Sequence, residues 1–247
     1  MQLDWIAFDA DDTLWQNEEI YREGREEFLD MMSKYSVRDR AEEAVDQVEL
    51  ENLPHYGYGA MSFILSLIET ALEITGGDFR GRDVRRLLEL GKEMLTAPPQ
   101  VFDGVPEVLE ELRSRFPLMM ITKGDLFHQQ RKVQNSGLEG YFRLVEVVSR
   151  KTVPVYRNLL ERFSIPPERF LMVGNSVRSD IQPVVTLGGW ALHVTEHLSW
   201  SHEEGVLSPG EQERVIDVGR IDRVSEVINR LTERKKGDPG GLIEDHP

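Results

Sequence analysis

From residue 101 onward, short apolar segments alternate with amphipathic ones, and this alternation restricts the fold more than any other feature of the chain. Apolar runs of four or five residues predict buried strands, and the segments between them have helical spacing. Such alternation is typical of a mainly parallel sheet with helices on both faces. Together with one earlier strand, the predicted strands cover residues 5–8, 118–121, 144–148, 170–173, 190–194 and 214–218, and the predicted helices cover 105–115, 125–135, 153–163, 181–187 and 221–231.

Residues 17–99 interrupt this alternation, because they contain helical patterns and no predicted strand. Asn17 is a plausible N-cap for the first helix, the segment 53–59 with its proline and glycines is predicted to break helicity, and Pro98 and Pro99 end the block. We predict a Rossmann-like α/β core domain, an inserted all-helical cap domain and a disordered tail. The predicted helices of the block are 17–35, 38–51, 60–74 and 81–95; the domains are 1–16 with 100–234 (core), 17–99 (cap) and 235–247 (tail).

Composition excludes several classes of protein. The 247 residues include 44 acids and 29 Lys or Arg, a net charge of −15, which disfavours a nucleic-acid binder because such affinity comes from neutralising phosphates. The absence of cysteine excludes disulfides and thiolate metal sites. No apolar run reaches membrane-spanning length, and no signal-peptide pattern precedes the first strand. We therefore expect a cytoplasmic protein with no membrane partner, and the sequence does not indicate its oligomeric state.

Three carboxylates, Asp9, Asp11 and Asp12, follow the first predicted strand directly, with Thr13 after them. Carboxylates this close raise one another's pKa unless a cation relieves the repulsion, so the cluster favours a hard divalent metal such as Mg²⁺. One acid could attack a substrate as a nucleophile while a second, two residues away on the same side of an extended segment, moves a proton. The alternative is a turn that caps the next helix, since Asp and Thr favour both positions.

Three later strand ends carry polar residues that suit phosphoryl chemistry. Thr122 and Lys123 follow the strand 118–121, where a hydroxyl and the amides of a helix start could hold phosphate oxygens. Lys151 follows the next strand and could neutralise a phosphate. Asn175 and Asp180 follow the strand 170–173, after a glycine turn. Each of these could by itself be an ordinary turn, helix cap or solvated cation, but the carboxyl ends of parallel strands share one edge of a sheet, where ligands bind.

Taken in this order, the four strand ends resemble those of the haloacid dehalogenase superfamily, specifically its phosphatase branch with a helical cap inserted after the first strand. The resemblance covers roughly residues 3–195, and Phe-Asp-Ala-Asp-Asp-Thr-Leu at residues 8–14 is its most specific motif. It implies that Asp9 is a nucleophile that becomes phosphorylated and Asp11 a general acid and base. It also implies that Thr122 hydrogen-bonds the transferring phosphoryl group and that Lys151 stabilises its charge.

The resemblance further implies a Mg²⁺ site formed by the carboxylate of Asp9, the backbone carbonyl of Asp11 and an acid in the last motif. The chain departs from the family here, because Asn175 follows Gly174 where the family usually has an aspartate. Asp180 is then the only carboxylate of the motif, and a neutral amide oxygen binds Mg²⁺ less strongly than a carboxylate does. We keep both Asn175 and Asp180 as candidate metal ligands.

The leading hypothesis is a Mg²⁺-dependent phosphatase that acts on a small phosphorylated metabolite. Thr13, Lys123 and Tyr58 are candidate phosphate- or substrate-binding residues, the last because the loop around Tyr56–Gly59 could cover the site; the alternative for this loop is a simple helix–helix turn. His193, His197 and His202 with Glu196 could suggest a zinc site, but they surround a strand end and a loop.

Three rival functions remain at this point. A dehalogenase would use its aspartate to attack carbon without a metal; Asn175 with Asp180 leans that way, whereas Asp11 argues against it, because displacement of halide needs no acid there. A phosphoaspartyl receiver domain also uses an acid cluster, Thr and Lys, but should be about half as long and lack the insert. A catalytically inactive binding protein is disfavoured because all four catalytic positions are filled.

Overall fold

The computed structural model describes residues 1–196 and 205–233, so the predicted tail at 235–247 lies outside the described residues. Its centre is a six-stranded sheet in which every neighbouring pair of strands is parallel. The spatial order is β5-β4-β1-β6-β7-β8, which places the first strand in the interior of the sheet. The strands are β1 (Trp5–Phe8), β4 (Leu118–Lys123), β5 (Leu144–Val148), β6 (Phe170–Gly174), β7 (Trp190–Val194) and β8 (Val215–Gly219).

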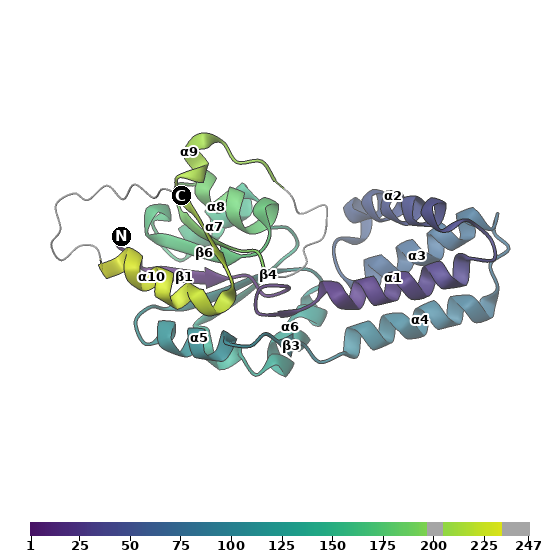
Figure 1. The fold of residues 1–247 in the computed structure, drawn as a ribbon, viewed down its shortest axis with the longest axis horizontal. Helices are drawn as coiled ribbons and strands as arrows, with labels where there is room; N and C mark the ends of the chain where they lie inside the picture. Colours follow the sequence, from purple (N-terminus) through teal and green to yellow (C-terminus); the bar gives the residue numbers. More distant parts are fainter. Residues whose placement is uncertain (197–204, 234–247) are drawn as a thin grey trace, which may run out of the picture.

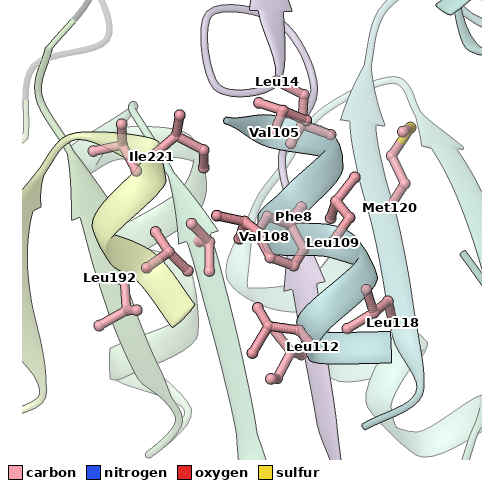
Figure 2. Close-up of a cluster of buried hydrophobic side chains, with 14 of the residues drawn as sticks. Phe8, Leu14, Val105, Val108, Leu109, Leu112, Leu118, Met120, Leu192 and Ile221 are labelled. Carbon is pink, nitrogen blue, oxygen red and sulfur yellow. The ribbon is translucent and has the colours of Figure 1, made fainter. Parts of the chain in front are cut away.

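Helices cover both faces of this sheet, as the sequence predicts (Figure 1). Successive residues of β1 point to opposite faces: Ile6 and Phe8 join one hydrophobic cluster, and Ala7 joins the other. Figure 2 shows the first cluster, which includes Phe8 of β1 and Leu109 of helix α5. Helices α5 (Val105–Arg113), α6 (Leu126–Ser136) and α10 (Val224–Glu233) pack on that face, and α7 (Val153–Arg162) and α8 (Gln182–Thr186) pack on the other.

Two predicted helices differ in detail from the structure. The one predicted at 181–187 begins earlier, because a π-helical turn precedes α8. The one predicted at 221–231 starts with a 3₁₀ turn before α10. Short elements that the sequence did not indicate are a further helix, α9, and two other 3₁₀ turns. The bounds are Val177–Ile181 (π), Ile221–Arg223, Glu139–Tyr141 and Pro167–Arg169 (3₁₀), and Pro209–Gln212 (α9).

Four helices form a block beyond the end of the sheet to which β1 points (Figure 1). Their apolar faces meet in a separate hydrophobic cluster around Phe28, Phe63, Leu67 and Leu87. The four helices of this block are α1 (Glu18–Met32), α2 (Arg38–Tyr56), α3 (Ala60–Ile74) and α4 (Gly81–Thr96).

Among the described residues, no helix is both long and apolar enough to cross a membrane.

Helix α2 is longer than the sequence predicts. The expected end at residue 51, with a helix break from residue 53, was wrong, because the helix continues through Pro54 to Tyr56. Proline removes one intrahelical hydrogen bond near the end of the helix, and the neighbouring contacts compensate for it. The buried Asn52 amide donates to Ser66 Oγ at 3.1 Å and to Glu69 at 2.7 Å, which holds the end of α2 against α3. Gly57, with φ +72°, then ends the helix.

The two segments that connect the helical block to the core pair with each other. Trp15–Gln16 (β2) and Gln100–Val101 (β3) form a small antiparallel ladder that the sequence did not indicate. Asn17 is the N-cap residue of α1, as the sequence predicts, but its side chain makes no cap hydrogen bond. Asp12, at φ +60°, supplies it instead: its carboxylate accepts from the backbone N–H groups of Asn17 and Glu18, each at 2.9 Å. The acid cluster therefore anchors the first helix of the block directly.

Candidate active site

A cavity of about 410 Å³ lies between the carboxyl end of the sheet and the helical block. The ends of parallel strands share this edge, so residues far apart in the sequence meet there. Of the candidate site residues, only Thr13 does not line the cavity. Those that do are Asp9, Asp11, Tyr58, Thr122, Lys123, Lys151, Asn175 and Asp180.

Lys151 joins two carboxylates at the base of the cavity. Its ammonium group forms ion pairs with Asp9 and, at 2.6 Å, with Asp180, and all three side chains are buried. Burial raises the pKa of Asp9 to about 7; the negative charge of Asp180 adds to this effect, and Lys151 opposes it. The ammonium group reduces the repulsion between the two carboxylates and keeps both of them at the base of the cavity.

Gly174 allows Asp180 to fold back under the end of β6. A side-chain carbon at position 174 would lie 2.5 Å from the Asp180 carboxyl carbon, so only glycine fits there. The second Asp180 oxygen accepts from the backbone N–H of Ser176 at 3.1 Å, while the first accepts from Lys151. Both oxygens of Asp180 are therefore engaged inside the protein.

Thr13 lies beneath the cavity and connects Asp9 with Asn175. Its buried hydroxyl is 3.1 Å from an Asp9 carboxylate oxygen and 3.2 Å from the Asn175 side-chain oxygen. The Thr13 hydroxyl thus holds an Asp9 carboxylate oxygen and the Asn175 amide oxygen close to each other, and both residues line the cavity. Hard oxygen donors of this kind suit Mg²⁺, which keeps several waters and uses only one or two carboxylates.

His193 supports the Asn175 turn from the next strand. Its Nε2 lies 3.0 Å from the backbone oxygen of Asn175, and its Nδ1 lies 2.9 Å from Asp217. Within residues 1–196 and 205–233, no group of three His, Asp or Glu side chains is arranged to hold a metal ion. The other two histidines of the zinc alternative, His197 and His202, lie outside the described residues.

Three donors converge on the carboxylate of Asp11. Trp15 Nε1 donates at 2.6 Å and Gln129 Nε2 at 2.9 Å, and Lys132 forms an ion pair. Burial alone would raise the pKa of Asp11, but Lys132 and the two neutral donors hold it below its ordinary value. These three donors hold the Asp11 carboxylate in one position and favour its ionised form. It lies at the end of the cavity that the strand ends form, which we call the catalytic end.

Sequence reasoning missed Gln129 and Lys132, which lie one turn apart on helix α6 and are both buried. Gln129 Nε2 also lies 2.7 Å from Thr122 Oγ1 and 2.8 Å from the Lys123 backbone oxygen, and its two hydrogens are shared among these two oxygens and Asp11. Since a hydroxyl has one hydrogen and two lone pairs, a donor on the Thr122 oxygen leaves its hydrogen for a ligand. The only sequence signal was the i, i+3 spacing of two polar residues, which is usual on any exposed helix face.

The loop between α2 and α3 reaches the catalytic end from the side of the helical block. The Lys123 ammonium lies 4.5 Å from the centre of the Tyr58 ring and 3.0 Å from Ser179 Oγ. Gly57 and Gly59, both at positive φ, flank Tyr58 and line the cavity with it. The loop therefore covers the site.

Comparison with known proteins identifies relatives of one family. Residues 3–185 match the haloacid dehalogenase-like hydrolase family. The pyrimidine 5'-nucleotidase YjjG of Escherichia coli is 30% identical over 203 residues, which are 76% of this chain and 84% of that protein. The mouse N-acylneuraminate-9-phosphatase is 27% identical over 197 residues, 74% of this chain and 78% of that protein.

The solved structures include a haloacid dehalogenase-like family hydrolase from Xanthomonas campestris with 35% sequence identity. It superposes with a TM-score of 0.82 and covers 94% of this chain and 93% of its own. Because the match extends over both the sheet and the helical block, it confirms the α/β fold with an inserted helical cap.

Proposed function

Because the chain belongs to the haloacid dehalogenase-like hydrolase family and is a phosphoric monoester hydrolase within it, we propose that it hydrolyses small phosphomonoesters with Mg²⁺ through an aspartyl-phosphate. The observation that carries this proposal is the meeting of Asp9, Asp11 and Lys151 at one cavity. A volume of about 410 Å³ suits a small phosphorylated metabolite.

In the first step, a carboxylate oxygen of Asp9 attacks phosphorus while the bond between phosphorus and the leaving oxygen breaks. Lys151 and the Thr122 hydroxyl bind the phosphoryl oxygens. The negative charge of the bound phosphate opposes the effect of Lys132 and raises the pKa of Asp11, so Asp11 takes up a proton when the substrate binds and gives it to the leaving alcohol. In the second step Asp11 takes a proton from water, and the water oxygen attacks phosphorus. The bond to Asp9 breaks, inorganic phosphate forms and both carboxyl groups return to their starting state.

The donor set supports Mg²⁺ held by the Asp9 carboxylate, the backbone oxygen of Asp11 and the Asn175 amide oxygen. When bound, the metal would neutralise charge on the phosphoryl oxygens. Asp180 is less suited to direct ligation, since Lys151 and the Ser176 N–H already occupy its oxygens. We assign Asp180 to the positioning of Lys151.

The dehalogenase alternative rests on Asn175, which follows Gly174 where the phosphatase branch usually has an aspartate, so that Asp180 is the only carboxylate of this motif. The contacts of Asp11 argue against a dehalogenase, because three donors position this carboxylate and halide displacement does not require it. A receiver domain would lack the helical block that covers the cavity. This block also provides a wall that a leaving group could contact.

The test is phosphate release from p-nitrophenyl phosphate with Mg²⁺ and with EDTA, beside chloride release from 2-chloropropionate. We expect phosphate release that needs Mg²⁺ and no chloride release. Chloride release in EDTA, without phosphatase activity, would instead establish the dehalogenase.

A further inference from the structure

The wall that the helical block contributes to the cavity differs in chemistry from the catalytic end. It includes Tyr21, Arg25, Glu49 and Ser62, and the Tyr21 ring packs edge-on against Phe63 at 5.2 Å. Burial raises the pKa of the Tyr21 phenol, and the charges of Asp11 and Glu49, which line the same cavity, raise it further. A leaving group that extends from the phosphate would therefore meet this wall.

The positive charge of Arg25 is already neutralised. Its guanidinium forms ion pairs with both Asp46 and Glu49, and the side chains of Arg25 and Glu49 are only 23% and 13% exposed. The other arginine of this wall, Arg22, is 60% exposed and pairs with Glu19. An anionic group on the substrate would thus find no buried cation at this end without breaking an existing pair.

The charge of the whole cavity reinforces this conclusion. Among the described residues that line it, eight carboxylates face five Lys or Arg side chains. Burial lowers the pKa of His128, the lining histidine, which keeps it neutral near pH 7. A phosphate brings further negative charge, so a second anionic group would be repelled.

Three polar groups of the wall have no hydrogen-bond partner within the described part of the chain: the hydroxyls of Tyr21 and Ser62 and the second carboxylate oxygen of Glu49. Ser62 is only 7% exposed. Burial raises the pKa of Glu49 to about 7, although Arg25 opposes the shift. All three residues line the cavity, and alcohol groups, which both donate and accept, would hydrogen-bond with all three.

Building on the phosphatase function above, we propose that the leaving group is an uncharged alcohol with several hydroxyls, of the polyol or sugar class. Its hydroxyls hydrogen-bond with Tyr21, Ser62 and Glu49 while the phosphate lies against Lys151 and Thr122. The closed pairs of Arg25 exclude substrates with a carboxylate or a second phosphate at the same position.

A matched pair of substrates tests this class directly. Sorbitol 6-phosphate and 6-phosphogluconate have six carbons and the same phosphate, and differ in a terminal alcohol against a carboxylate. At about pH 8, where Glu49 is ionised, we expect kcat/KM to favour the alcohol by about tenfold. A preference below threefold, or for the acid, overturns the inference. p-Nitrophenyl phosphate is assayed alongside: if it releases no phosphate, the proposed function itself has failed.

Glu49→Gln tests the residue assignment, because it removes the charge and keeps the shape. Each rate is divided by the same variant's rate with p-nitrophenyl phosphate, which cancels differences in folded fraction. We expect the alcohol-to-acid ratio to fall at least threefold. Glu51→Gln, an exposed position on the same helix outside the cavity, is the control and should keep the wild-type ratio. A smaller fall in Glu49→Gln, or an equal fall in both variants, overturns the assignment.

Discussion

The ammonium group of Lys132 pairs with the carboxylate of Asp11, which brings a buried lysine of helix α6 into contact with the proposed acid and base. The same ammonium donates to the Asn17 side chain at 2.8 Å, where the chain enters the helical block. Lys132 thus links the position of Asp11 to the connection between the two parts of the molecule. The effect of Lys132 on the rate of hydrolysis should therefore depend on how much protonation the leaving group needs.

Lys132→Met should slow the hydrolysis of an alkyl phosphate by about 10- to 100-fold, because a misplaced Asp11 protonates the leaving oxygen poorly. The loss with p-nitrophenyl phosphate should be several times smaller, since that leaving group needs little protonation. The measurement is kcat/KM for both substrates. Lys92→Met, on an exposed site of helix α4, is the control and should match wild type. Equal losses on both substrates would contradict a role in acid catalysis.

Gly174→Ala should disturb the base of the cavity without touching a catalytic side chain. The new methyl group would overlap Asp180, so we expect a loss of about 1–3 kcal/mol in the free energy of unfolding, with reduced activity. Urea denaturation measures the first and phosphate release the second. Gly140→Ala has no neighbour within 4 Å of the added carbon and serves as the control. Wild-type stability in Gly174→Ala would mean that Asp180 does not sit beneath β6.

Asn175→Asp should tighten the binding of Mg²⁺. A carboxylate in place of the amide adds a full charge beside the metal, so half-maximal activity should require several-fold less Mg²⁺. Turnover need not rise, because the same charge repels the phosphate. The measurement is activity against Mg²⁺ concentration. In Asp180→Asn the turnover should fall while the Mg²⁺ midpoint stays within about twofold, since we place Asp180 on Lys151. An unchanged Mg²⁺ midpoint in Asn175→Asp together with a raised midpoint in Asp180→Asn would make Asp180, and not Asn175, the metal ligand.

Glu49 should make stability depend on pH. Burial raises its pKa in the folded protein to about 7, above the ordinary value of 4.5, so the folded state holds this proton more tightly than the unfolded state. The resulting stabilisation is full below pH 4.5 and is lost as the pH rises to 7. Relative to Glu49→Gln, wild type should lose on the order of 2 kcal/mol between pH 4.5 and pH 8. Urea unfolding of both proteins at the two pH values is the measurement, and parallel changes would contradict the shift.

The sequence predicted the parallel sheet and most of the strand-end site because both follow from local patterns. Asp9 follows β1 directly, Thr122 lies near the end of β4 and Lys151 lies three residues after β5, and parallel strands bring such ends together. Lys132 and Gln129 could not be predicted in this way. Their role depends on which face of α6 meets the strand ends, a tertiary relationship that helical spacing alone does not give.

The same distinction explains the errors in the helical block. Pro54 has a strong local signal for a helix break, yet contacts of Asn52 with α3 carry the helix beyond it. Asn17 has the local signal of a cap, yet Asp12 reaches the same backbone groups from a positive-φ position. Tertiary contacts overrode local preference in both cases.

The proposed mechanism requires that phosphate is transferred from the substrate to Asp9 during turnover. Acid quenching during turnover of a phosphate-radiolabelled substrate, followed by peptide mass spectrometry, tests it most directly. We predict a hydroxylamine-sensitive label on the peptide that contains Asp9, and neither label nor phosphate release in Asp9→Asn. Phosphate release at the wild-type rate in Asp9→Asn would show that Asp9 is not the nucleophile.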